Sequence, residues 1–206
     1  MTLSGVGGSI ISMDQISDFR PDLDTAQTWV ADLISAVRPD QLDSPTPCTE
    51  YDVRGLLQHI SALPAKVTAV AAGGNRRELP PQVAIDEEGV GERYREEAAA
   101  ALGAWGDDAL LTTTLTAPWG PAPGGAALGG FVMETVAHGW DLAVATGQDP
   151  EADPALAAKA HAIGERALAE APRGSGMPFG TPVEAPAGAG PTTRLAAFLG
   201  RSWDRG

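Results

Sequence analysis

The 206-residue sequence has only one cysteine, Cys48, and only two lysines, Lys66 and Lys159. A single cysteine cannot form a disulfide within the chain. Two lysines argue against a lysine-based phosphate clamp, and no Gly-x-x-x-x-Gly-Lys loop occurs. The sequence also lacks the Gly-x-Ser-x-Gly elbow and the His-Glu-x-x-His pair. These absences leave sites that are assembled from side chains on several elements.

Basic residues are scarce as well, because 14 Lys and Arg face 27 Asp and Glu, which gives a formal net charge of −13. Nucleic acids and anionic membranes bind positive surfaces, so we expect neither as a partner. The longest mostly apolar stretch, 126–145, is interrupted by Glu134, His138 and Asp141. It therefore predicts a buried helix with polar groups rather than a membrane span.

The beginning of the sequence is rich in Gly and Ser and has no sustained hydrophobic period. We interpret residues 1–20 as a flexible leader and residues 21–206 as a single domain, since the length fits one domain of ordinary size. The leader lacks the basic region of a secretory signal, so we expect a cytoplasmic protein. We assign Glu134 to the core and expect most other acidic residues on the surface.

Apolar residues recur at helical spacing in five segments. Thr49 or Asp52 is expected to cap the second helix, and Pro64 is expected to kink it. Gly147 should end the fourth helix. The predicted helices cover residues 22–37, a segment starting at 53, and residues 87–105, 127–146 and 154–170.

The remaining segments are expected to be short or irregular. Residues 110–117 include several β-branched side chains, which favour a short extended segment. The sequence shows no strand partner for it, and a Pro/Gly loop follows at 119–125. Residues 171–191 form a tail of Gly, Pro and Ala, and residues 194–201 predict a short closing helix. The fold class is therefore all-α: a four-helix bundle with long loops and a short C-terminal extension, whose interior commonly holds a metal or small molecule.

Three side chains are candidate metal ligands. Glu134 and His138 are separated by four residues and share one face of the fourth helix, and His59 lies at the edge of the apolar stripe of the second helix. Together they would give three donors and leave coordination positions open for water or substrate. Such a mixed set suits Zn²⁺, with Ni²⁺, Fe²⁺ and Mn²⁺ as alternatives. The alternatives without a metal are a surface pair beside a core histidine, or a buried hydrogen-bond network.

Four further residues are expected to have supporting or structural roles. Asp141 shares the face of His138 and could accept its second N–H, or else pair with Arg54 or lie at the surface. Cys48 is expected to act as a small apolar side chain, and Trp140 as packing. His161 is expected to be solvated.

Two segments resemble a known family. They are Pro45-Thr-Pro-Cys-Thr-Glu-Tyr-Asp-Val-Arg-Gly-Leu-Leu-Gln-His59 and His138-Gly-Trp-Asp-Leu-Ala-Val-Ala-Thr-Gly-Gln148, followed by Arg194-Leu-Ala-Ala-Phe-Leu-Gly-Arg201. They are similar to actinobacterial metal-binding proteins related to the N-terminal domain of mycothiol-dependent maleylpyruvate isomerase, within the DinB/YfiT-like superfamily. The resemblance implies a DinB-like bundle with a divalent metal, usually zinc, held by His59, Glu134 and His138.

The resemblance also implies mycothiol as a thiol cosubstrate and a small electrophile as its partner, in an S-transferase or isomerase reaction. The three residues would then be ligands rather than acid or base catalysts. In the isomerase, a second domain contributes an arginine to the active site. We expect no such domain here, and only Arg194 or Arg201 could supply the positive charge in its place. Isomerisation of maleylpyruvate itself is therefore not expected. The rival hypothesis is a non-catalytic interaction module with a structural metal. The sequence does not fix the oligomeric state, and a homodimer is compatible with it.

Overall fold

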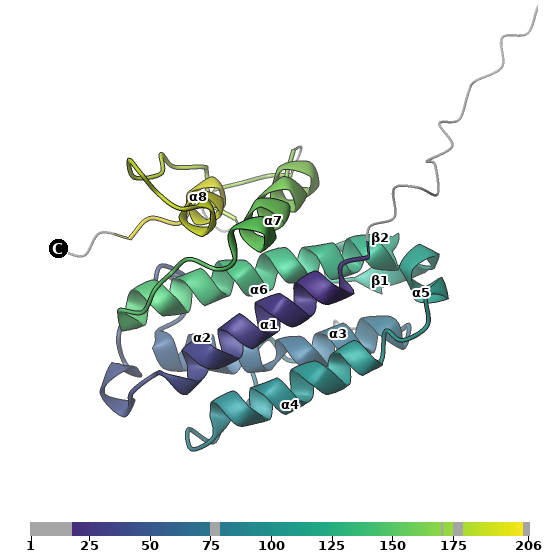
Figure 1. Ribbon diagram of the computed structural model, residues 1–206, viewed down its shortest axis with the longest axis horizontal. Helices are drawn as coiled ribbons and strands as arrows, with labels where there is room; N and C mark the ends of the chain where they lie inside the picture. The colour runs from purple at the N-terminus through teal and green to yellow at the C-terminus, as the bar shows by residue number, and fades with distance from the viewer. Residues whose placement is uncertain (1–17, 75–78, 170, 175–178, 204–206) are drawn as a thin grey trace, which may run out of the picture.

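The computed structural model describes residues 18–74, 79–169, 171–174 and 179–203. It is an all-α, DinB-like bundle in which α1 lies between α4 and α6 (Figure 1). The opposite side of the bundle is closed by α2, which packs on α6, and by α3, which packs on α4. The bundle helices are α1 (Arg20–Ser35), α2 (Val53–Ser61), α3 (Leu63–Ala71), α4 (Val90–Gly103) and α6 (Gly124–Thr146).

The C-terminal part of the chain forms a smaller layer over α6. In it, α7 and α8 pack on each other and on the central helix α6 (Figure 1). The elements outside the bundle are η2 (Pro39–Gln41), α5 (Ala109–Thr112), β1 (Thr114–Ala117), β2 (Gly120–Pro123), α7 (Pro154–Ala167) and α8 (Pro191–Phe198).

The predicted start of α2 and the predicted end of α6 are found in the structure. Asp52, rather than Thr49, is the N-cap of α2, and its carboxylate accepts the N–H of Gly55. Gly147 ends α6 in the left-handed conformation, with φ of 76°. Pro64 does more than kink the second helix: the chain leaves α2 at Ser61 and begins α3 at Leu63.

The segment after α4 differs from the prediction. Its first residues form the short helix α5, and only Thr114–Ala117 is extended. Its partner is β2, inside the predicted Pro/Gly loop, with Thr114 opposite Pro123 and Ala117 opposite Gly120. The sequence showed no strand partner for this segment, but the structure provides one. The prolines of β2 are tolerated because β2 is an edge strand, in which a residue without an N–H need not donate to another strand.

Several predicted boundaries also shift by a few residues. The first helix begins at Arg20, within the predicted leader, of which residues 1–17 lie outside the described part of the chain. The third helix ends at Gly103, and Trp105 beyond it is fully buried with its indole N–H on the carbonyl of Val67. The closing helix spans Pro191–Phe198, because proline suits the first helical position.

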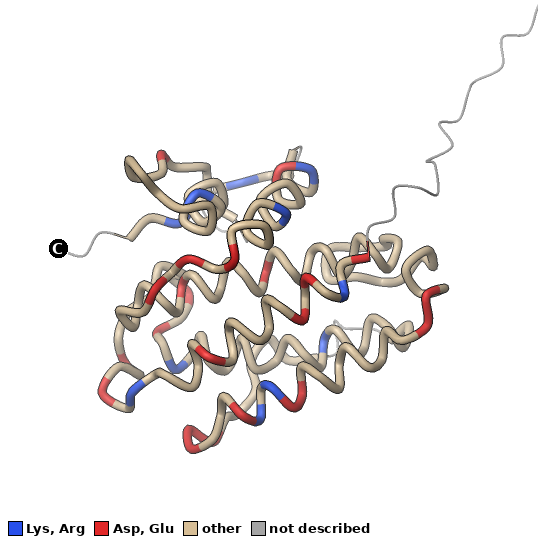
Figure 2. The backbone as a smooth tube through the Cα atoms, in the orientation of Figure 1, with Lys and Arg blue, Asp and Glu red and all other residues tan. Residues whose placement is uncertain are grey.

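Helix α6 is the centre of the core. Leu128 and Phe131, near its start, pack in one hydrophobic cluster, and Leu142 and Ala143, near its end, pack in another. The sequence predicted this buried helix with polar groups. Among the described residues, no helix combines the length and apolarity needed to cross a membrane. Acidic residues occur along α1 and α4 and in the connecting loops (Figure 2).

Gly139 allows α1 to approach α6 closely. A Cβ at this position would lie 2.2 Å from Cζ3 of Trp29 and 2.9 Å from Cγ2 of Val30. We expect Gly139→Ala to lower the free energy of unfolding by about 1–2 kcal/mol, because the overlap outweighs the gain of about 1 kcal/mol in helix propensity. Urea unfolding at an unchanged m-value measures the difference.

Gly103, at the end of α4, provides the matched control. A Cβ there would meet nothing within 4 Å. Gly103→Ala should therefore stabilise the protein by up to about 1 kcal/mol. Equal effects of the two substitutions would contradict the packing argument.

Candidate metal centre

The three predicted donors come together between α2 and α6. His59 lies in the last turn of α2, and Glu134 and His138 lie one turn apart on α6. Each of the three offers one ligand atom, and these atoms all lie within 4.8 Å of one another. Nε2 of His59 is 3.7 Å from Oε1 of Glu134. The bundle thus brings all three sequence-predicted residues into one site.

Both imidazoles have their Nδ1 engaged by an oxygen acceptor. Nδ1 of His59 is 2.9 Å from the carbonyl oxygen of Pro81, and Nδ1 of His138 is 3.1 Å from Oδ2 of Asp141. A carbonyl and a carboxylate can only accept, so in the neutral rings each Nδ1 carries the proton. Each Nε2 is then left with its lone pair, which is the tautomer that metal-ligating histidines usually have.

The environment keeps Glu134 ionised. Its side chain is 25% exposed, and burial raises its pKa. When the two imidazoles are protonated, the hydrogen bond from His59 and the positive charges of His138 and Lys66 outweigh burial, so the pKa of Glu134 lies below its ordinary value. Glu134 is therefore a carboxylate at neutral pH, the form in which it can bind a cation.

Two neighbours of the site were missed in the sequence. Tyr51, just before the α2 cap, stacks on His59 with ring centroids 5.1 Å apart. Lys66 is buried in α3, and its Nζ lies 3.5 Å from the same Pro81 carbonyl that His59 contacts. The spacing of seven residues between His59 and Lys66 was a usable signal, because it places both on one face of the broken helix.

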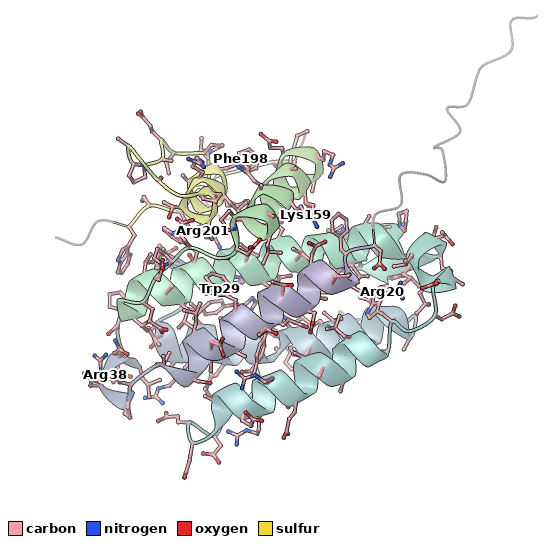
Figure 3. The ribbon with its side chains drawn as sticks, in the orientation of Figure 1. Arg20, Trp29, Arg38, Lys159, Phe198 and Arg201 are labelled. Atoms are coloured by element: carbon pink, nitrogen blue, oxygen red, sulfur yellow. The ribbon has the colours of Figure 1, made fainter. Side chains whose placement is uncertain are left out.

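Asp141 supports His138 from the buried side. It is fully buried, whereas Glu134 is only partly so, and this reverses the expectation that Glu134 is the acidic residue of the core. Its other oxygen, Oδ1, lies 3.5 Å from Nε of Arg201, on the side of α8 that faces α6 (Figure 3). The alternative pairing with Arg54 was wrong, because Arg54 contacts the acidic residues Asp43 and Glu87.

The two candidate arginines therefore have different places. Arg201 is an ion-pair partner of Asp141, while Arg194 donates to the carbonyl of Ala189 near the surface. Trp140 packs as expected and donates to Oγ1 of Thr193. His161 is not fully solvated: it is half-buried against Phe198, with centroids 5.1 Å apart, because α8 covers this part of α7.

A cavity of about 250 Å³ lies elsewhere in the bundle. Its walls include Ile34 of α1, Leu57 of α2 and Val90 of α4, together with Arg38 and Glu87. None of the three candidate ligands lines it. The chemistry of the donor set, rather than the size of a hollow, therefore identifies the candidate site.

The same residues lie in a segment that matches a protein family. The family model described as the mycothiol maleylpyruvate isomerase N-terminal domain matches residues 23–143. The chain belongs to this family. Membership confirms the resemblance seen in the sequence and links the chain to mycothiol-related chemistry. His59, Glu134 and His138 all lie inside the matched segment.

Relatives of this family member occur in mycobacteria. Two uncharacterized proteins of Mycobacterium tuberculosis, from strains CDC 1551 / Oshkosh and H37Rv, are each 33% identical to it over 177 residues. The match covers 86% of this chain and 94% of each relative. No solved structure matches the chain significantly.

Proposed function

We propose that His59, Glu134 and His138 bind one divalent metal ion, with zinc as the ion that suits the set best. The observation that carries this proposal is that both Nδ1 atoms lie beside oxygen acceptors, which leaves the two Nε2 atoms available to bind a cation together with the Glu134 carboxylate. Three acceptors at this separation repel one another unless a proton or a metal ion lies among them. Two neutral imidazoles and one carboxylate are a common donor set for zinc.

An uncharged hydrogen-bond network explains the same atoms less well. The Nδ1 protons of His59 and His138 are directed to Pro81 and Asp141, so neither neutral ring offers a proton to Glu134. A proton on one Nε2 would supply the missing positive partner of Glu134. A metal ion supplies it as well, and it leaves both imidazoles neutral. The donor set thus fits the implied metal.

We propose further that the protein takes a small-molecule thiol, mycothiol being the thiol linked to the family, and passes it to an electrophile in an S-transfer or isomerisation reaction. A divalent ion at this site would lower the pKa of a bound thiol. Glu134 provides one negative charge, the two histidines hold fixed tautomers, and Tyr51 covers the ring of His59.

The rival hypothesis, a structural metal in a non-catalytic module, would require a fourth protein ligand. Asp141 is the nearest candidate, but Oδ2 contacts Nδ1 of His138 and Oδ1 faces Arg201. Among the described residues, Asp141 thus lies beside Nδ1 of His138 and is not grouped with the donor atoms of His59 and Glu134. This supports three protein ligands and an open position, which is typical of catalytic sites.

Metal analysis of the purified protein tests the proposed site. We expect one equivalent in the wild type and almost none in His59→Ala or His138→Ala, because each substitution removes a donor. His161→Ala is the matched control, since this histidine contacts Phe198 and not the site. Metal that stays at the wild-type level in both ligand variants would overturn the site.

The thiol part of the proposal has its own test. In protein loaded with Co²⁺, adding mycothiol should shift the visible spectrum and add thiolate-to-cobalt charge-transfer absorption. The Cys48→Ser variant should give the same change, because the thiol comes from the cosubstrate. A spectrum unaffected by mycothiol would contradict a thiol-binding function while leaving the metal site intact.

A further inference from the structure

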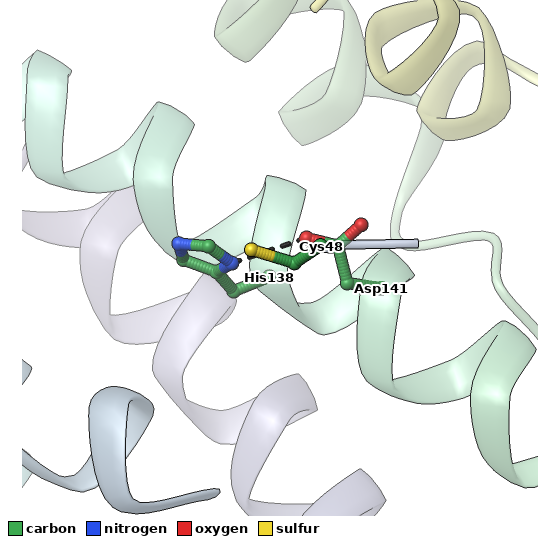
Figure 4. Close-up of side chains that lie close together, drawn as sticks. All are labelled: Cys48, His138 and Asp141. Atoms are coloured by element: carbon green, nitrogen blue, oxygen red, sulfur yellow. Dashed lines mark hydrogen bonds and ion pairs between the residues drawn. The ribbon is translucent and has the colours of Figure 1, made fainter. Parts of the chain in front are cut away.

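A second group of metal-ligating side chains lies on the other nitrogen of His138. Cys48, His138 and Asp141 each offer one ligand atom, and these atoms lie within 4.8 Å of one another (Figure 4). All three residues are buried. Nδ1 of His138 faces this group, because it lies 3.1 Å from Oδ2 of Asp141.

Cys48 is buried, in agreement with its interpretation as a small apolar side chain, but it also has polar neighbours. It is buried, but among the described residues it belongs to none of the hydrophobic clusters. Its neighbours are the imidazole of His138 and the carboxylate of Asp141. A thiol beside an imidazole and a carboxylate also has the neighbours that a metal ligand has.

The loop before α2 holds this thiol in place. Oγ1 of Thr46 lies 2.9 Å from the carbonyl oxygen of Cys48 and 2.7 Å from that of Tyr51. The N–H of Tyr51 donates to the Cys48 carbonyl at 2.9 Å. Two hydrogen bonds thus hold the carbonyl of Cys48 in a closed turn, from which its sulfur lies near His138 and Asp141 of α6.

Asp141 gives the group a second feature of a binding site. Among the described residues, its buried Oδ1 accepts no hydrogen bond, although it forms an ion pair with Nε of Arg201 at 3.5 Å. A buried carboxylate with spare acceptor capacity beside a thiol and an imidazole can bind a cation. The mixture of sulfur, nitrogen and oxygen donors favours thiophilic ions over Mg²⁺ or Ca²⁺.

We propose that Cys48, His138 and Asp141 form a second metal site, which takes a thiophilic divalent ion. On binding, the Cys48 S–H bond breaks, its proton leaves to solvent, and a sulfur–metal bond forms. The His138 proton moves from Nδ1 to Nε2, so that Nδ1 donates its lone pair. Nothing is oxidised or reduced.

This proton movement makes the two sites mutually exclusive, a consequence that rests on the proposed function. A neutral imidazole has only one lone pair, so His138 cannot serve His59 and Glu134 through Nε2 while it serves Cys48 through Nδ1. An excess of a thiophilic ion would thereby remove one ligand from the proposed catalytic site.

Titration with Cd²⁺ tests the second site, because a bound thiolate gives charge-transfer absorption in the ultraviolet. His59→Ala removes a donor only from the first site, which is formed by His59, Glu134 and His138. We expect this variant to develop the absorption with one equivalent of Cd²⁺. His59→Ala combined with Cys48→Ser should show none, since Cys48 is the only cysteine. No absorption in folded His59→Ala would overturn the proposal.

A further variant tests the ligand set rather than the thiol alone. His59→Ala combined with His138→Ala should need about tenfold or more Cd²⁺ for half-saturation, because an imidazole donor is lost. Unchanged half-saturation would show that Cys48 binds without His138 and would also overturn the proposal. Zinc content of Cys48→Ser reports on the first site alone, so the failure of one site is distinguished from the failure of the other.

Discussion

Asp141→Ala is expected to lower the free energy of unfolding by about 3–5 kcal/mol, the usual cost of leaving one partner of a buried ion pair behind. The side chain of Arg201 is only 11% exposed, so its guanidinium would remain largely out of water without its carboxylate. Nδ1–H of His138 would lose its acceptor as well. Urea unfolding in the presence of a chelator measures this effect apart from any metal.

The matched control is Asp43→Ala. Asp43 also pairs with an arginine, Arg54, but its side chain is 89% exposed. Water screens such a pair, so the control should change stability by no more than about 1 kcal/mol. If the two substitutions cost the same, the buried pair does not contribute as argued.

Asp141→Asn separates the support of His138 from the fold. The amide keeps an oxygen that can accept the His138 proton but loses the charge opposite Arg201. We expect metal affinity to fall by about 10- to 100-fold, as for other partners of metal-bound histidines. Metal titration in folded protein gives this number, and unchanged affinity would argue against a supporting role for Asp141.

The main helices and the candidate ligands were predictable because each depends on local spacing. Glu134 and His138 are one helical turn apart, and the Asp52 cap sets the phase of α2 and therefore the side of His59. When α2 packs on α6, the helix faces that carry His59, Glu134 and His138 are turned toward each other, so the three donors lie close together. The family match then supports the same bundle independently of the spacing.

What the sequence did not predict depends on contacts between distant segments. Arg201 reaches Asp141 only because α8 folds back over α6, and the Gly/Pro-rich chain before α8 has no period from which to infer this. Cys48 comes to His138 through a loop whose conformation depends on Thr46 bonding two carbonyls. The hairpin of β1 and β2 was hidden because prolines in β2 resemble loop residues.

Removal of metal is expected to lower the unfolding midpoint by about 10 °C. A ligand that binds only the folded state at a thousand times its dissociation constant stabilises it by about 4 kcal/mol. For a chain of this size, each kcal/mol shifts the midpoint by about 2–4 °C. The effect should be large here because His59 and Glu134 come from different helices, so the unfolded chain offers no preformed site.

Thermal unfolding with and without a chelator measures the shift. His59→Ala should show almost no response to the chelator, and Cys48→Ser should respond like the wild type, because Cys48 lies outside the first site. An unchanged wild-type midpoint would contradict a metal bound by the native state. A response lost only in Cys48→Ser would instead assign the stabilising metal to the second site, because that variant keeps every donor of the first.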